Sequence, residues 1–132
     1  MGSNNTDNQD EAAKLKGKTG ITRIFNAFGY SLSGLKLAFK HEAAFRQLFL
    51  LNVVLIPVAF ILDVSSVERV LLIASVFLTL IIELFNSAIE AVVDRVSLSI
   101  HPLSKQAKDM GSAAQLLGLI LVTVTWLIIL LS

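Results

Sequence analysis

One stretch of the chain joins a long apolar run to a regularly spaced set of polar side chains. Residues 70–82 carry no charge, and residues 83–95 follow them without a proline or glycine, so we expect a single helix across both. Five polar side chains of the second part fall within roughly 60° of one line along this helix. They are Glu83, Asn86, Ser87, Glu90 and Asp94. A carboxylate inside a membrane segment is costly and normally faces a protein interior or a wet cavity, so this stripe predicts a functional face.

The remaining apolar runs fix the fold class. Apolar residues make up 55% of the 132 residues, and the mean hydropathy is +0.74, too apolar for an ordinary soluble domain. We expect spans at about 44–62, 70–93 and 110–131, and hence an all-α membrane protein with three transmembrane helices. Ala114 and Gly118 have the small-residue spacing that allows close helix contact.

The N-terminal part has a different character. Residues 1–20 are almost wholly polar, so we expect them to be disordered. Residues 21–42 follow helical spacing with one apolar face, which favours an amphipathic helix in the membrane interface, broken near Gly29 or Gly34. The alternative for this segment is a helix packed on a soluble core. We expect residues 21–132 as a whole to form one domain.

The cationic residues predict how the chain lies in the membrane. Residues 1–47 carry seven Lys and Arg, the connection 94–109 carries three, and the connection 63–69 carries one. The positive-inside rule therefore places the N-terminus and the 94–109 connection in the cytoplasm, and the C-terminus on the other side. The net charge of +1 gives no global field that favours nucleic acid, so we expect no nucleic-acid partner. The absence of cysteine excludes disulfides and thiolate metal ligands.

The polar groups on the cytoplasmic side have a common chemistry. Carboxylate and amide oxygens are the ligands that Mg²⁺ prefers, together with phosphate oxygens, and a lysine neutralises phosphate charge. The set favours magnesium-dependent phosphate chemistry at a membrane surface, with Glu83, the deepest acid, as candidate base. The residues are Glu42, Glu83, Asn86, Glu90, Asp94, Lys108 and Asp109.

Each group also has a purely structural interpretation. Glu42 alone fits a solvated charge at a helix end, and Asn86 fits a hydrogen bond between helices. Asp109 fits the N-cap of the third span with Lys108 at the lipid headgroups. Trp126 fits a packing or interfacial residue. Glu83 with Glu90, seven residues apart on one face at membrane depth, fits a structural role least well.

These motifs resemble the small integral-membrane diacylglycerol kinases of bacteria. The resemblance covers roughly residue 20 to the C-terminus. It lies in Glu83-Leu-Phe-Asn86-Ser-Ala-Ile-Glu90-Ala-Val-Val-Asp94-Arg95, Glu42-Ala-Ala-Phe-Arg46-Gln47, Lys108-Asp109-Met-Gly-Ser112-Ala-Ala, and Thr22-Arg23 with Gly29-Tyr30-Ser31. It implies a homotrimer in the bacterial inner membrane, with three transmembrane helices and one surface helix per subunit. It also implies transfer of the ATP γ-phosphate to the primary hydroxyl of diacylglycerol, giving phosphatidic acid, with Mg²⁺ as cofactor.

The resemblance assigns roles to residues by position. Glu83 resembles the base that takes the hydroxyl proton, and Glu42 and Glu90 resemble the carboxylates that hold the metal. The positions implied at the nucleotide are Arg23, Tyr30, Glu42, Asn86, Glu90, Asp94, Ser99, His101, Lys108 and Asp109. The positions implied at the lipid substrate are Arg23, Ala44, Phe45, Arg46, Gln47, Leu48, Glu83, Ser112 and Trp126.

Two other functions remain open from the sequence. An undecaprenol kinase of the same fold would use the same active-site residues, although the match over residues 42–47 and 108–114 favours the diacylglycerol type. A small proton or ion transporter could use Glu83 and Glu90 as a relay, without ATP. That function gives no reason for Glu42, Lys108 and Asp109 to lie on the same side.

Overall fold

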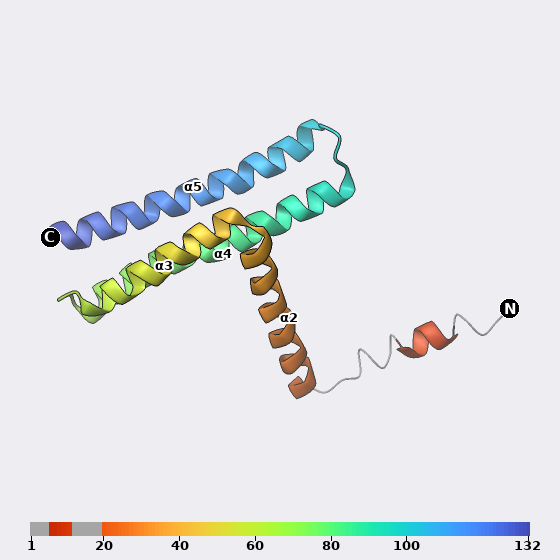
Figure 1. Ribbon diagram of the computed structural model, residues 1–132, viewed down its shortest axis with the longest axis horizontal. Coiled ribbons are helices and arrows are strands. Elements are labelled where there is room, and N and C mark those ends of the chain that lie inside the picture. Colours follow the sequence, from red (N-terminus) through yellow and green to blue (C-terminus); the bar gives the residue numbers. More distant parts are fainter. Residues whose placement is uncertain (1–5, 12–19) are drawn as a thin grey trace. The chain divides into compact units, whose positions relative to one another are not determined.

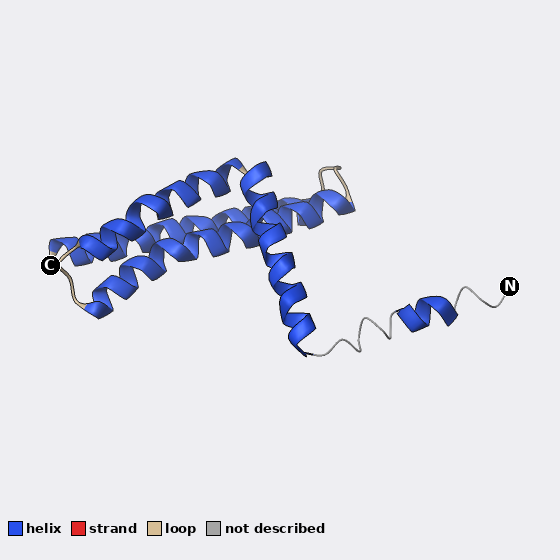
Figure 2. Cartoon of the chain, turned by 60° about the horizontal axis from the view of Figure 1, so that its bottom comes forward, coloured by secondary structure: helices blue, strands red, loops and turns tan. Residues whose placement is uncertain are grey.

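The computed structural model describes residues 6–11 and 20–132 (Figure 1). Its long helices are α2 (Gly20–His41), α3 (Ala43–Ile61), α4 (Ser66–Val96) and α5 (Pro102–Leu131), and the described residues contain no strand (Figure 2). Residues 6–11, in the segment expected to be disordered, form a short helix, while the rest of 1–19 lies outside the described residues. The chain divides into two units, Met1–Lys36 and Leu37–Ser132, which we describe separately.

Three helices are long and apolar enough to cross a membrane: α3, α4 and α5. The prediction of an all-α chain with three spanning helices is therefore confirmed. The first span begins at Ala43, close to the expected boundary, but α4 and α5 begin earlier than expected. The second connection is consequently short, at residues 97–101, and most of the expected 94–109 loop is helix.

Helix capping explains the earlier starts. Ser65 and Glu68 form a capping box, in which Glu68 N–H donates to Ser65 Oγ and Ser65 N–H donates to Glu68 Oε2. At α5, Leu103 N–H donates to His101 Nδ1 at 3.1 Å, and Pro102 occupies the first turn. The N-cap interpretation of Asp109 is therefore wrong, because Asp109 lies two turns inside the helix.

Within the second unit, α4 packs against both α3 and α5. The three run side by side, with the α3–α4 turn and the C-terminus at one end and the α4–α5 connection at the other (Figures 1 and 2). The core lies in the half nearest the α3–α4 turn. It consists of Ala59, Leu72, Val76, Val122 and Trp126. Burial of apolar surface there stabilises the half of the bundle near the α3–α4 turn. The half near the α4–α5 connection is left for polar contacts.

Two small residues bring α5 close to α4. A side chain at Gly118 would meet Ile82 Cδ1 at 2.8 Å, and one at Gly111 would collide with Asn86. Gly118 is thus the close-contact residue we expected, but Ala114 is exposed. Gly111 lies seven residues before Gly118 and therefore on the same face of α5. It makes the second close contact with α4 that was predicted for Ala114.

Arg69 closes the α3–α4 turn. Its Nε donates to Ala59 O at 3.0 Å and its Nη2 donates to Leu62 O at 2.9 Å and to Val64 O at 3.4 Å. These are carbonyls at the end of α3 and in the turn, where the helix itself supplies no further N–H donors. One half-buried guanidinium therefore satisfies the backbone at this end of the bundle.

Helix α2 is continuous, so the expected break near Gly29 or Gly34 is wrong. A Cβ added at either glycine would meet nothing within 4 Å, so no close approach requires a glycine there. Each costs about 1 kcal/mol of helix propensity, which the rest of a 22-residue helix tolerates. The apolar side chains of α2 are exposed, with Phe25 at 71% and Phe28 at 63%.

Candidate functional site

Glu83 lies on the face of α4 that meets α5. It is only 5% exposed, although it is an acid inside a spanning helix. Its Oε2 accepts a hydrogen bond of 2.8 Å from Gln115 Nε2, while Oε1 has no hydrogen-bond partner among residues 6–11 and 20–132. Glu83 therefore faces the protein interior, as predicted, with one oxygen committed and one free. Gln115 was not among the predicted site residues.

Asn86 lies one turn further along α4, against Gly111 of α5. Its Oδ1 is buried and has no hydrogen-bond partner within the described chain. The contact with Gly111 matches the helix-packing interpretation of Asn86, but the expected hydrogen bond between helices is not formed by this oxygen. A buried acceptor without a donor costs about 1–3 kcal/mol, so this position holds a polar group that packing alone does not require.

Glu90 continues the same line toward the connection. It lies about 10 Å from Glu83 along the α4 axis and within about 20° of it around the helix. It is half-buried and makes no hydrogen bond or ion pair in the part of the chain that the structure describes. Its carboxylate is therefore available for a ligand.

Glu42 occupies the corner between α2 and α3. Its N–H donates to Ala38 O at 2.9 Å, its C=O accepts from Arg46 N–H at 3.2 Å, and its side chain does not cap α3. Arg46 Nη1 also donates to Phe39 O at 2.9 Å and Lys40 O at 3.0 Å, carbonyls at the end of α2. The corner is thus fixed through its backbone, and the Glu42 carboxylate is left uncommitted.

The register between α3 and α4 brings Glu42 and Glu90 to the same height. Asn52 Nδ2 of α3 lies 3.5 Å from Thr79 Oγ1 of α4. The two helices are antiparallel. Glu42, ten residues before Asn52 of α3, is therefore level with the part of α4 about ten residues after Thr79, which is close to Glu90. Thr79 and Glu90, eleven residues apart, also lie within about 20° on α4. Glu90 therefore lies close to the line of α4 on which Thr79 contacts both α3 and α5.

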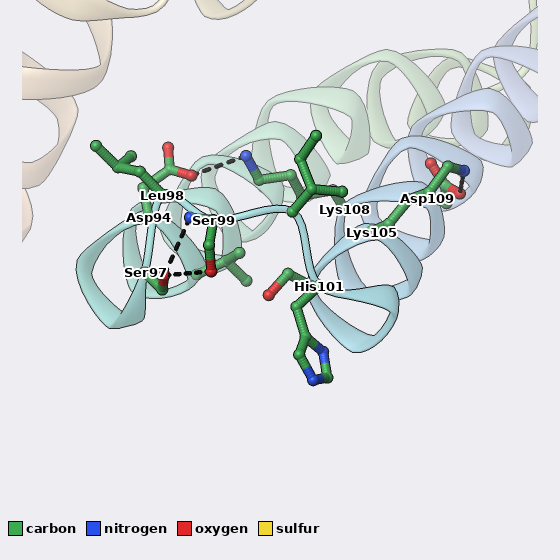
Figure 3. Close-up of a pocket in the computed structure, with 11 residues that line it drawn as sticks. Asp94, Ser97, Leu98, Ser99, His101, Lys105, Lys108 and Asp109 are labelled. Atoms are coloured by element: carbon green, nitrogen blue, oxygen red, sulfur yellow. Dashed lines mark hydrogen bonds and ion pairs between the residues drawn. The ribbon is translucent and has the colours of Figure 1, made fainter.

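A pocket of about 240 Å³ opens where α4, the connection and α5 meet (Figure 3). It brings together five of the residues implied at the nucleotide: Asp94, Ser99, His101, Lys108 and Asp109. It also includes three polar residues that the sequence analysis did not single out: Ser97, Ser104 and Lys105. Lys105 lies three residues before Lys108, and this helical spacing was the available signal.

Two lysines of the pocket are held in ion pairs. Lys108 Nζ lies 2.7 Å from Asp94 Oδ1, and Lys105 Nζ lies 2.5 Å from Asp109 Oδ2 (Figure 3). The side chains of the first pair are 43% and 49% exposed, and those of the second 72% and 62%. Ion pairs this exposed to solvent contribute little to stability. Both ammonium groups are therefore easily transferred to an anionic ligand.

The connection is ordered by its own side chains. Ser99 N–H donates to Ser97 Oγ at 3.0 Å, and the two hydroxyl oxygens lie 2.7 Å apart. His101 Nδ1 is used in capping α5, and its ring points away from Lys108 (Figure 3). Ser99 therefore keeps a hydroxyl in the pocket, whereas His101 has only one ring nitrogen left for a ligand.

The residues implied at the lipid substrate are spread over the chain. Phe45 and Leu48 are buried on α3, whereas Ala44, Gln47 and Ser112 are exposed. Trp126 is buried, and its Nε1 donates to Leu72 O at 3.3 Å, about 16 Å from the level of Glu83 along α4. The packing interpretation of Trp126 fits this position. Arg23 and Tyr30 share one face of α2 in the first unit.

The described residues contain no group of three or more His, Asp or Glu side chains placed to hold a metal ion. A magnesium ion, however, commonly takes only one or two carboxylates from the protein and the rest of its ligands from phosphate and water. The uncommitted carboxylates of Glu42 and Glu90 fit that smaller set. The site therefore combines the buried acid Glu83, the acids Glu42 and Glu90, whose carboxylates make no hydrogen bond or ion pair within the described residues, and a pocket lined by lysines.

Residues 29–130 match the model of the family described as prokaryotic diacylglycerol kinase. This chain belongs to the prokaryotic diacylglycerol kinase family. It is similar to a diacylglycerol kinase of Pseudomonas aeruginosa, at 70% identity over 118 residues that cover 89% of this chain and 96% of that protein. It is 53% identical over 114 residues to a diacylglycerol kinase of Escherichia coli, covering 86% and 93% of the two chains. The resemblance drawn from the sequence motifs is confirmed.

A relative in Helicobacter pylori, 48% identical over 107 residues, also carries the name diacylglycerol kinase, and covers 81% of this chain and 84% of that protein. The relatives therefore favour the kinase prediction over the transporter, and the diacylglycerol type over the undecaprenol type.

Gly111 allows a test of the contact at Asn86. We expect Gly111→Ala to lower the free energy of unfolding by about 1–3 kcal/mol, because the added methyl group displaces the Asn86 side chain. Gly29→Ala is the matched control: its methyl group meets open space, so it should raise stability by about 0.5–1 kcal/mol. Both are measured by denaturant unfolding in detergent micelles. Equal effects of the two substitutions would contradict the tight contact.

Proposed function

We propose that this chain is a diacylglycerol kinase that transfers the γ-phosphate of ATP to the primary hydroxyl of diacylglycerol and gives phosphatidic acid. The observation that carries the proposal is the buried Glu83 carboxylate with one free oxygen, on the same line of α4 as Glu90 and Asp94. Membership of the family and the names of the relatives support it. We expect the hydroxyl of a membrane lipid to reach Glu83 more easily than a soluble alcohol would.

The nucleotide would lie along α4 from the pocket toward Glu83. Lys105 and Lys108 supply positive charge for phosphate oxygens in place of their exposed ion pairs. Glu90, about 6 Å from Asp94 and about 10 Å from Glu83 along the axis, lies between the pocket and the base. This arrangement directs the terminal phosphate toward Glu83.

Glu42 and Glu90 would hold Mg²⁺, because both carboxylates are uncommitted and the register gives them the same height. The ion, when bound, neutralises charge on the phosphates. Glu83 Oε1 takes the proton of the lipid hydroxyl while the hydroxyl oxygen forms its bond to the γ-phosphorus. The bond between the γ-phosphorus and the oxygen of ADP breaks. The proton then remains on Glu83 until solvent removes it.

We further propose a homotrimer in the bacterial inner membrane, with the N-terminus and the site in the cytoplasm. The distribution of lysine and arginine supports this orientation. The exposed apolar side chains of α2 support its lying in the membrane interface, where an apolar face is covered by acyl chains. The homotrimer is proposed from the resemblance to the small integral-membrane diacylglycerol kinases.

The decisive experiment incubates the purified chain in mixed micelles with Mg²⁺, ATP and either diacylglycerol or undecaprenol. We expect phosphatidic acid as the main product. Glu83→Gln keeps the size of the side chain and removes its basicity, so kcat should fall by about 10²–10⁴-fold while binding of ATP persists. Asp63→Asn, at the far turn, is the control and should leave the rate unchanged. Preferential phosphorylation of undecaprenol, or full activity of Glu83→Gln, would overturn the assignment.

The metal site has a separate test. Glu90→Gln should raise the Mg²⁺ concentration needed for half-maximal rate by about tenfold or more, since an amide replaces a carboxylate ligand. Glu11→Gln, an exposed acid outside the spans, is the control. The measurement is initial rate against free Mg²⁺ at saturating ATP. An unchanged metal dependence would remove Glu90 from the metal site.

The trimer is tested by mass. The chain has a mass of 14.3 kDa, and we expect light scattering coupled to size exclusion, corrected for detergent, to give three times that value. Chemical cross-linking in native-like bilayers should give a ladder that ends at the third band. A fully active monomer or dimer would contradict the proposal.

A further inference from the structure

Gln115 is a polar side chain in the middle of an otherwise apolar stretch of α5, and the proposed reaction does not yet use it. Its Nε2 donates to Glu83 Oε2 at 2.8 Å and to Thr79 O at 3.0 Å. We propose that Gln115 is a positioning residue, which holds Glu83 so that Oε1 is the oxygen that takes the hydroxyl proton. The inference rests on the proposed function.

The two acceptors determine which way the Gln115 amide points. Both hydrogens of the amide nitrogen are directed at oxygens, whereas the reversed amide would bring its own oxygen against a carboxylate and a carbonyl. The Gln115 Oε1 is buried and has no hydrogen-bond partner among the described residues. An apolar side chain would avoid this unpaired acceptor. Packing alone is therefore a poor reason for a glutamine at this position.

The surroundings hold Gln115 in place. Thr79 is fully buried, and its Oγ1 lies 3.5 Å from Asn52 Nδ2, so the polar contacts continue to α3. Asn52 Nδ2 also donates to Leu48 O at 2.8 Å. On the other side, a Cβ at Gly118 would come within 3.2 Å of Gln115 Oε1, so the missing side chain makes room for the amide. All three spans thus contribute to the position of one carboxylate.

The hydrogen bond matters because a carboxylate has two equivalent oxygens. A donor on Oε2 stops rotation about the last bond of Glu83 and leaves Oε1 in one direction. Bonds to a charged acceptor are shorter and stronger than neutral ones. Rate depends steeply on such alignment, because small misplacements of a reacting group reduce the rate by large factors.

Gln115→Met tests the role, because methionine has the same length and no donor. We expect kcat for diacylglycerol to fall about tenfold to a hundredfold, with KM for Mg·ATP changed less than about twofold, since nucleotide residues are not touched. Gln106→Met is the matched control: it makes the same change on an exposed part of α5, outside the pocket. We expect wild-type kcat from it.

A spectroscopic measurement tests the contact without activity. The chain has four glutamines, Gln9, Gln47, Gln106 and Gln115, so glutamine-selective labelling gives few side-chain amide signals, and Gln115→Met assigns one by its loss. In Glu83→Gln we expect the Gln115 amide protons to move upfield, because a neutral acceptor bonds more weakly. If Gln115→Met does not fold, single methionine variants of Gln9, Gln47 and Gln106 assign the other three signals, the remaining one belongs to Gln115, and the spectrum of Glu83→Gln decides.

An unmoved Gln115 signal, or a folded Gln115→Met with wild-type kcat, would overturn the inference. If the wild-type chain has no kinase activity, the proposed function is overturned. The catalytic role of Gln115 is then overturned as well, even if the Gln115 amide signal shifts in Glu83→Gln. Loss of kcat together with a raised KM in both methionine variants would show a general structural effect and would also overturn it.

Discussion

The contact between α4 and α5 is the constraint from which the rest of the molecule follows. Helix α4 carries a line of acids and amides at membrane depth, and such groups must be covered by protein or by a wet cavity. Gly111 and Gly118 let α5 come close enough to cover Glu83 and Asn86. Toward the connection a pocket opens between α4 and α5, and Asp94 and Asp109 in it are exposed. One helix pair thus buries Glu83 and the Oδ1 atom of Asn86 and, further along, forms an open pocket.

The acids of the site differ in how they are engaged. Asp94 and Asp109 are neutralised by lysines in exposed pairs, and Glu83 is held by a neutral amide. The carboxylates of Glu42 and Glu90 make no hydrogen bond or ion pair within the described residues. In the proposed function this gradation matches different chemistry to similar side chains. The paired acids would exchange their cations with a ligand, the acids without hydrogen bonds would hold a metal, and Glu83 would accept a proton.

The fold was largely predictable from the sequence, because span length and apolar composition require three helices in a membrane. The boundaries were not, since they depend on local capping. The capping box at Ser65 and Glu68 had a readable sequence signal that we did not use. In the site, the stripe from Glu83 to Asp94 was readable from helical spacing. Gln115 was not, because a single glutamine in an apolar run acquires meaning only when the register places it beside Glu83.

Arg69 has a consequence for how the bundle sits in lipid. Its guanidinium is occupied by backbone carbonyls at the far turn, and no other lysine or arginine lies between residues 47 and 94 or after residue 108. That end therefore has no free cation to anchor it to headgroup phosphates, unlike the end with the pocket. Where bilayer thickness changes, the far turn should shift in depth while the reactive end stays level with the headgroups.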